Sequence, residues 1–218
     1  MSEINLLKNY PSSTRNIKSR IINKDLNREV ALKFGKEYFD GSREQGYGGY
    51  HYDGRWIPVA HDIVNHFKLS SGMKLLDVGC AKGFLCKDLV SVCPGLNVYG
   101  IDISEYAISM AHPEVKDYMQ VADARSIPYP DNFFDAVISI NTIHNLNRPD
   151  CILALKEIQR LSHGKSYIQV DAYRNDVERK LFEDWMLTAK TYDTPSGWVR
   201  ILEEAGYSGD YFWTIMEV

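Results

Sequence analysis

The sequence predicts an α/β fold, in which a mostly parallel sheet carries helices on both faces. Short apolar runs alternate with stretches of helical periodicity after residue 57. One of these runs, residues 73–76, leads straight into the glycine turn DVGCAKG, and a helical pattern follows from Phe84. A strand, a glycine turn and a helix in this order make half of a parallel crossover unit.

The composition is that of an ordinary globular protein, and we expect one main domain with a large core. The 218 residues are 44% hydrophobic and 25% charged. A formal charge of −4 gives no overall attraction for nucleic acid, so we expect no nucleic-acid partner. The sequence lacks a run long enough for a membrane span, and its first residues lack a signal core, which predicts a cytoplasmic protein without a membrane contact. The four cysteines fit no zinc spacing and are expected to be reduced thiols.

Residues 1–56 are predicted to be an N-terminal extension with helical and loop parts. We expect an arm or irregular helix over residues 1–25 and a helix over 25–39. Residues 41–56 combine five glycines with four large aromatic side chains, which excludes regular structure and also a plain linker. This stretch is either a lid with glycine hinges or a compact loop packed by its own side chains.

Residues 57–218 are predicted to form the alternating domain. Helices are expected at 57–67, from Phe84, from the cap Ser104 to Met110, and at 150–161, 176–183 and 195–205. Strands are expected at 73–76, from Tyr99 to Asp102, and at 117–121, 133–140, 166–170 and 211–217. A further strand at 186–191 would bring the sheet to seven strands, and without it the sheet has six.

Three elements at fixed distances carry a family resemblance. Asp77, Gly79 and Gly83 form the pattern Asp-x-Gly-x-x-x-Gly after a strand, and Asp102 ends a second strand 25 positions after Asp77. The run Val-Ala-Asp-Ala at 121–124 precedes a Pro-containing loop and a fourth strand at 127–139. Together they resemble class I S-adenosylmethionine-dependent methyltransferases over residues 57–218. The resemblance implies a Rossmann-like, seven-stranded sheet, S-adenosyl-L-methionine as cofactor and S-adenosyl-L-homocysteine as product.

The resemblance also implies roles for individual residues. It assigns the methionine ammonium to Asp77, the ribose hydroxyls to Asp102, the adenine to Ile103, Asp123 and Ala124, and a contact near the sulfonium to Asn141. Its other cofactor positions are Gly79, Cys80, Ala81, Gly83 and Phe84. Many members have glycine where this chain has Ala81, and we expect cofactor binding to survive with a slightly displaced loop. The three acids also have structural alternatives, namely a hydrogen bond to the turn for Asp77, a helix cap for Asp102 and a turn for Asp123.

His144 is the candidate general base. It follows the fourth strand, where ligands gather at the carboxyl edge of a parallel sheet, and an ordinary histidine pKa of about 6.5 suits proton transfer near neutral pH. Its structural alternative is a hydrogen bond to a loop carbonyl. Candidate substrate contacts are Tyr47, Tyr50, His51 and Arg55 in the possible lid, and Asp171 and Tyr173 after the fifth strand, for which a surface loop is the alternative.

These observations predict methyl transfer to a hydroxyl or an amine of a small molecule. A sugar or nucleotide-linked sugar is favoured because tyrosine, histidine and arginine offer stacking and phosphate contacts together. The alternatives are another metabolite, such as an amine, a quinone precursor or a natural-product intermediate, and a non-catalytic cofactor-binding partner subunit. The chain lacks the Asp pair typical of magnesium-dependent catechol methyltransferases, so we predict no metal. Nothing in the sequence indicates the oligomeric state.

Overall fold

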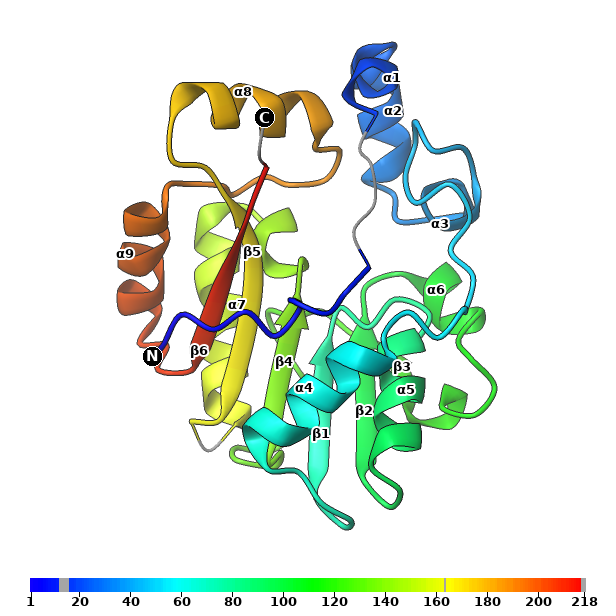
Figure 1. The fold of residues 1–218 in the computed structure, drawn as a ribbon, viewed down its shortest axis with the longest axis vertical. Helices are drawn as coiled ribbons and strands as arrows, with labels where there is room; N and C mark the ends of the chain where they lie inside the picture. The colour runs from blue at the N-terminus through cyan, green and yellow to red at the C-terminus, as the bar shows by residue number, and fades with distance from the viewer. Residues whose placement is uncertain (12–15, 163, 217–218) are drawn as a thin grey trace.

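The structure is a computed structural model that describes residues 1–11, 16–162 and 164–216. In these residues six strands form one sheet in the order β3-β2-β1-β4-β5-β6. Every neighbouring pair of strands is parallel, so all strands end at the same edge (Figure 1). The strands are β1 (Lys74–Val78), β2 (Asn97–Asp102), β3 (Met119–Val121), β4 (Ala136–Ile140), β5 (Ser166–Ala172) and β6 (Asp210–Ile215).

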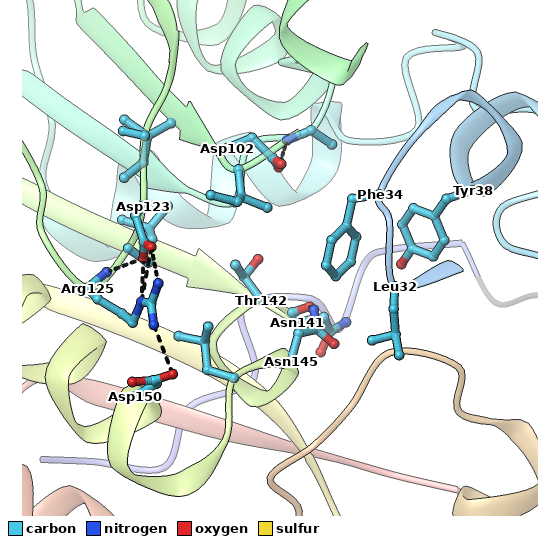
Figure 2. A pocket seen from close by; sticks show the side chains of 18 of the residues that line it. Leu32, Phe34, Tyr38, Asp102, Asp123, Arg125, Asn141, Thr142, Asn145 and Asp150 are labelled. Carbon is cyan, nitrogen blue, oxygen red and sulfur yellow. Dashed lines mark hydrogen bonds and ion pairs between the residues drawn. The ribbon is translucent and has the colours of Figure 1, made fainter. Parts of the chain in front are cut away.

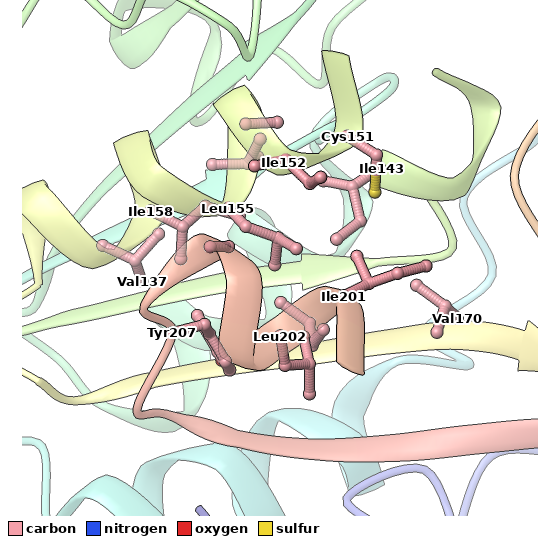
Figure 3. Close-up of a cluster of buried hydrophobic side chains, with 14 of the residues drawn as sticks. Val137, Ile143, Cys151, Ile152, Leu155, Ile158, Val170, Ile201, Leu202 and Tyr207 are labelled. Atoms are coloured by element: carbon pink, nitrogen blue, oxygen red, sulfur yellow. The ribbon is translucent and has the colours of Figure 1, made fainter. Parts of the chain in front are cut away.

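Helices cover both faces of the sheet because successive strand residues point to opposite sides. Leu75 packs with α4 (Ile57–Phe67) and α5 (Phe84–Val92) on one face. Leu76 packs with α7 (Arg148–Leu161) and α9 (Pro195–Ala205) on the other face (Figure 3). The two resulting core clusters bury the apolar stripe of each of these helices and hold the sheet rigidly between them.

The helix ends confirm several sequence signals. The Ser104 side chain accepts a hydrogen bond from the Ala107 amide at the start of α6 (Glu105–Ser109). Helix α9 begins with Pro195 and ends at Gly206, whose φ of 66° is left-handed. Helix α8 (Asp176–Trp185) was also expected from the sequence, and its structure runs two residues beyond the predicted end.

The N-terminal extension places three short helices over the carboxyl edge of the sheet (Figure 1). They are α1 (Ile17–Ile21), α2 (Lys24–Ala31) and α3 (Lys36–Asp40), so the single helix predicted for 25–39 is wrong. The chain leaves the helical path at Phe34, which adopts a left-handed φ of 48° between α2 and α3. Residues 41–56 form turns and bends, as predicted, and the Tyr47 amide attaches them to α3 by a hydrogen bond to the Tyr38 carbonyl.

The strand predicted at 186–191 is also wrong, and the sheet has six strands instead of seven. Leu187 and Ala189 are buried, which explains the strand-like pattern. The amides of Lys190 and Thr191, however, donate to the carbonyl of His144 and not to a neighbouring strand. Two other strands are shorter than predicted: β4 begins three residues late, and a 3₁₀ turn at Lys116–Tyr118 precedes β3.

Residues 1–11 cross the sheet from its outer strand β6 towards its middle (Figure 1). Glu3 forms an isolated parallel bridge with Tyr211 of β6, and Leu6 is buried in the same core cluster as α4. Tyr10 then packs on Trp56 with 4.5 Å between the ring centroids. The first residues therefore contribute to the main core, while the division into residues 1–56 and 57–218 stays a prediction. Within the described residues, no helix is long and apolar enough to span a bilayer.

Candidate active site

Two cavities lie side by side at the carboxyl edge of the sheet. The first has a volume of about 400 Å³ and the second about 470 Å³, which is within the usual range for small-molecule sites. They share the lining residues Tyr47, Gly79, Ala81, Ile140 and Asn141. The shared wall stands where the chain order reverses between β1 and β4, which is the place where open parallel sheets bind ligands.

Besides Gly79 and Ala81, five predicted cofactor residues line the first cavity together (Figure 2). They come from the ends of β2 and β4 and from the loop after β3, and they are Asp102, Ile103, Asp123, Ala124 and Asn141. Phe34 and Tyr38 of the N-terminal extension face them across the cavity, as Figure 2 shows. The cavity thus has a polar wall from the sheet and an aromatic wall from the extension.

Asp102 connects two loops at this wall. Its Oδ2 accepts a hydrogen bond of 2.8 Å from the Ala81 amide, and its Oδ1 accepts one of 2.9 Å from the Ser104 amide. Burial raises the pKa of Asp102, although both amides favour its ionised form. A carboxylate has about four acceptor sites, so this one keeps capacity for the hydroxyls of a bound ribose.

Asp123 is already paired in this structure, which the sequence did not indicate. Arg125 contacts both of its oxygens, with 2.6 Å between Nη2 and Oδ2, and also reaches Asp150 at 3.0 Å (Figure 2). The Arg125 guanidinium holds the pKa of Asp123 below its usual range. An adenine amine at this position would therefore share the Asp123 carboxylate with Arg125.

The glycine turn at residues 79–83 is packed too closely for a side chain at Gly79. At Gly79, whose φ is 88°, an added Cβ would lie 2.0 Å from Oγ1 of Thr142. Ala81 has a left-handed φ of 50°, a conformation that explains why glycine suits this position in the family. Gly83 and Phe84 line neither cavity: Gly83 precedes α5 with a φ of 70°, and Phe84 stacks on Tyr50 with 4.8 Å between the centroids.

The second cavity contains a buried acid without a cation. Asp77 lines this cavity, is 4% exposed and accepts only a long thiol contact of 3.6 Å from Cys86. Burial raises the pKa of Asp77 to about 7. No ion pair to it is formed within the described residues, so its chemistry fits a ligand that supplies a positive charge, such as the ammonium of a methionine.

The extension supplies much of the second cavity. Tyr50 and Arg55 line it as predicted substrate residues, while Tyr47 lines both cavities. Arg55 lies near its mouth and is ion-paired to Asp53 at 2.5 Å. The aromatic and polar side chains that line the second cavity and that sequence reasoning missed include Tyr10, Trp56, Gln169 and Thr214. A polar Gln169 inside a buried strand was the one usable signal among them.

Besides Gly83 and Phe84, four predicted site residues lie outside both cavities, namely His51, His144, Asp171 and Tyr173. His144 is 4% exposed, and its Nδ1 accepts the Asp171 amide of β5 at 3.2 Å, whereas its structural alternative was a bond to a loop carbonyl. Burial lowers the pKa of His144. This geometry gives no support to His144 as the general base, and it points to a role in holding the segment around Lys190.

An ion pair fastens the extension to the glycine turn. Lys82 contacts both carboxylate oxygens of Asp40 at 2.7 Å and donates to the Tyr50 carbonyl at 3.0 Å. Tyr106 of α6 donates to the same carboxylate at 2.6 Å. The Lys82 and Asp40 side chains are only 5% and 17% exposed. The loop that would contact the cofactor and the segment that covers it are thus joined through one buried cluster.

A family model described as a methyltransferase domain matches residues 76–169, which include the glycine turn and the strands that frame the first cavity. Over residues 76–169 the chain thus matches a methyltransferase domain, and the solved structures that share its fold include methyltransferases. Members of this family use S-adenosylmethionine as methyl donor. Among solved structures, a methyltransferase in complex with the Haloferax volcanii Trm112 methyltransferase activator has the same fold, with a TM-score of 0.55 and 21% identity over 67% of this chain and 66% of that one.

Three curated relatives show the breadth of the family. A sterol 24-C-methyltransferase of Gibberella zeae is 32% identical over 53% of this chain and 33% of its own length. An uncharacterized methyltransferase of Schizosaccharomyces pombe is 29% identical over 74% of this chain and 70% of its own. A tRNA (carboxymethyluridine(34)-5-O)-methyltransferase of Arabidopsis thaliana is 30% identical over 62% of this chain and 32% of its own. This chain thus spans about a third of the length of the sterol and tRNA enzymes.

Proposed function

We propose that this chain binds S-adenosylmethionine across both cavities and transfers its methyl group to a hydroxyl or an amine of a small molecule. The observation that carries the proposal is the meeting of the two cavities at Gly79 and Asn141. Asp102, with free acceptor capacity, lies on one side of this meeting point, and Asp77, without a cation, lies on the other. A ligand with a ribose at one end and an ammonium at the other matches both acids at once.

Different residues would bind different parts of the cofactor. Asp102 would hold the ribose, Asp123 and Ala124 the adenine edge, and Asp77 the ammonium. The bound cofactor supplies a methyl group on a positively charged sulfur, which needs only an aligned nucleophile. Residues 41–56, with Tyr47 on both cavities, would act as the lid that keeps water from this point.

The acceptor would enter the second cavity, between aromatic side chains of the extension and the ends of β5 and β6. Within the described residues no histidine lines either cavity, so the proton of a hydroxyl acceptor would leave to a carboxylate or to water. An amine acceptor needs no such base once it is deprotonated. Tyrosine and tryptophan faces suit a sugar ring as well as a flat conjugated ring, so the sugar acceptor stays a prediction.

The proposal is tested by transfer of a labelled methyl group. The protein is incubated with S-adenosylmethionine carrying a trideuteriomethyl group and with the small-molecule fraction of a cell extract, and products are found by mass spectrometry. We expect a metabolite that gains one trideuteriomethyl group with wild-type protein and not with Asp102→Ala. Tight cofactor binding without any labelled product would favour the non-catalytic partner subunit instead.

A further inference from the structure

A chain of hydrogen bonds runs through the interior to the floor of the second cavity. The Tyr167 hydroxyl bonds Oε1 of Gln169 at 2.9 Å, and Nε2 of Gln169 bonds Oγ1 of Thr214 at 2.8 Å. Gln169 and Thr214 line the cavity, whereas Tyr167 is fully buried in the core. Tyr167 and Gln169 lie on β5 and Thr214 lies on β6, and we call these three side chains the floor relay.

The direction of the floor relay follows from the burial of Tyr167. Tyr167 is fully buried, and its phenol proton therefore needs an acceptor within the protein. Oε1 of Gln169 is that acceptor, which fixes the orientation of the amide and turns its Nε2 towards Thr214. The Thr214 oxygen then accepts, and its own proton has no acceptor within the described residues. This proton is free to be donated into the cavity.

The floor relay lies too far from the proposed cofactor anchor to serve the methionine end. Asp77 is on β1, and the sheet order places β5 two strands and β6 three strands away. Strands are spaced by about 4.8 Å, so Thr214 is separated from the strand of Asp77 by roughly 14 Å across the sheet. The carboxylate and ammonium of one amino acid lie on the same carbon centre and cannot span this distance.

We propose that the floor relay recognises the methyl acceptor, and that this acceptor carries a carbonyl or carboxylate oxygen on a flat conjugated body. Thr214 donates to that oxygen, and the paired rings of Tyr10 and Trp56 line the same cavity for the flat body. Tyr167 is a positioning residue that acts through Gln169. The inference rests on the proposed function, since it assigns the rest of the second cavity to the cofactor's methionine end.

Two small aromatic probes test this proposal on protein saturated with S-adenosylhomocysteine. Acetophenone can only accept a hydrogen bond, while benzyl alcohol can accept and donate. We expect Thr214→Val, which keeps the shape but removes the hydroxyl, to weaken acetophenone binding about tenfold, and Thr214→Ser to change it less than about twofold. Affinity for S-adenosylhomocysteine, measured by calorimetry, should be the same in all three proteins.

Tyr167→Phe distinguishes a positioning role from a merely structural one, because only the positioning role predicts different affinity changes for the two probes. Without the phenol proton the Gln169 amide is free to reverse, and Thr214 then donates to Gln169 and no longer to the ligand. Acetophenone should lose affinity about as much as in Thr214→Val, whereas benzyl alcohol should not, because it can donate to Thr214. Equal losses for both probes would indicate general damage and overturn the positioning role.

The remaining outcomes decide whether Thr214 contacts an oxygen of the methyl acceptor or an oxygen of the cofactor. Unchanged acetophenone binding in Thr214→Val, or no acetophenone binding to wild type, would overturn the inference. Loss of S-adenosylhomocysteine affinity in Thr214→Val would assign the floor relay to the cofactor and also overturn it. If wild type binds no S-adenosylhomocysteine, the proposed function fails, and the same acetophenone titrations without it then decide the inference separately.

Discussion

At the scale of single residues, the site depends on carboxylates whose surroundings differ. Asp123 is paired with Arg125, Asp102 accepts two backbone amides, and Asp77 has neither a cation nor an amide. The sequence placed all three at strand or loop ends. It could not show that Arg125 would contact Asp123, because that contact depends on a side-chain conformation and on Asp150 of a later helix.

Asp77 predicts a pH dependence of cofactor binding. Its pKa of about 7 means that the free protein holds the carboxyl neutral below that pH, and pairing with an ammonium requires the proton to leave. Affinity for S-adenosylhomocysteine should therefore fall below pH 7, by up to about tenfold per unit, and Asp77→Asn should remove this dependence. Calorimetry across pH measures both proteins. A wild-type profile parallel to that of the variant would contradict the assignment.

The raised pKa of Asp77 also determines how its contribution to folding stability changes with pH. The folded pKa of Asp77 lies above the ordinary 3.8, so its favourable contribution is present at low pH and is lost as the pH rises through about 7. Without cofactor, wild type should lose stability relative to Asp77→Asn between about pH 4 and 7, and the difference should stay constant above that range. Thermal unfolding of the two proteins gives this comparison.

At the scale of elements, two connections attach irregular segments, the N-terminal extension and residues 186–191, to the rest of the fold. The Asp40–Lys82 pair joins the extension to the glycine turn, and His144 joins the segment 186–191 to the sheet edge. Neither connection has a sequence signal. The glycines and aromatics of 41–56 correctly predicted an irregular segment, but its anchor, Lys82, lies inside the cofactor motif itself.

Breaking the Asp40–Lys82 pair should loosen the extension. Asp40→Asn leaves the Lys82 ammonium buried without its counter-charge, which costs about 3 kcal/mol of unfolding free energy. Hydrogen exchange over residues 36–56 should also become faster. Glu204→Gln is the matched control, because its pair with Arg148 is about half exposed and contributes less than about 1 kcal/mol. Equal effects of the two variants would mean that the buried pair does not fasten the extension.

His144 should act on stability and not on cofactor binding. Burial lowers its folded pKa below the unfolded value of about 6.5, so its contribution is fully present above that pH and is lost as the pH falls below it. Wild type should lose up to about 1.4 kcal/mol per pH unit more than His144→Asn, which keeps an acceptor for the Asp171 amide. His61→Asn, at an exposed position, is the control. A slower methyl transfer with unchanged stability would restore His144 as a candidate base.

At the scale of the whole molecule, periodicity predicted most of the fold because most elements bury one face against a single sheet. The helix at 57–67 and the helix at 195–205 have the predicted bounds. Two regions depend on contacts that are distant in the sequence and leave no periodic signal: residues 2–4 bond to Tyr211 of β6, and the amides of Lys190 and Thr191 bond to the carbonyl of His144. In the first cavity the sequence predicted the residues that follow strands, such as Asp102 and Asn141, but not Phe34 and Tyr38 of the extension. Tyr10 and Thr214 of the second cavity, which come from the two chain ends, were also missed.

The central claim is that the acids at the ends of β1 and β2 hold S-adenosylmethionine, and calorimetric titration with S-adenosylhomocysteine tests it most directly. We predict binding to one site in wild type, about 10- to 100-fold weaker binding to Asp102→Ala, and unchanged binding to Asp117→Ala, an exposed acid near β3. Thermal unfolding of Asp102→Ala shows whether the variant is folded. Equal affinity of folded Asp102→Ala and wild type, or no binding to wild type, would contradict the claim.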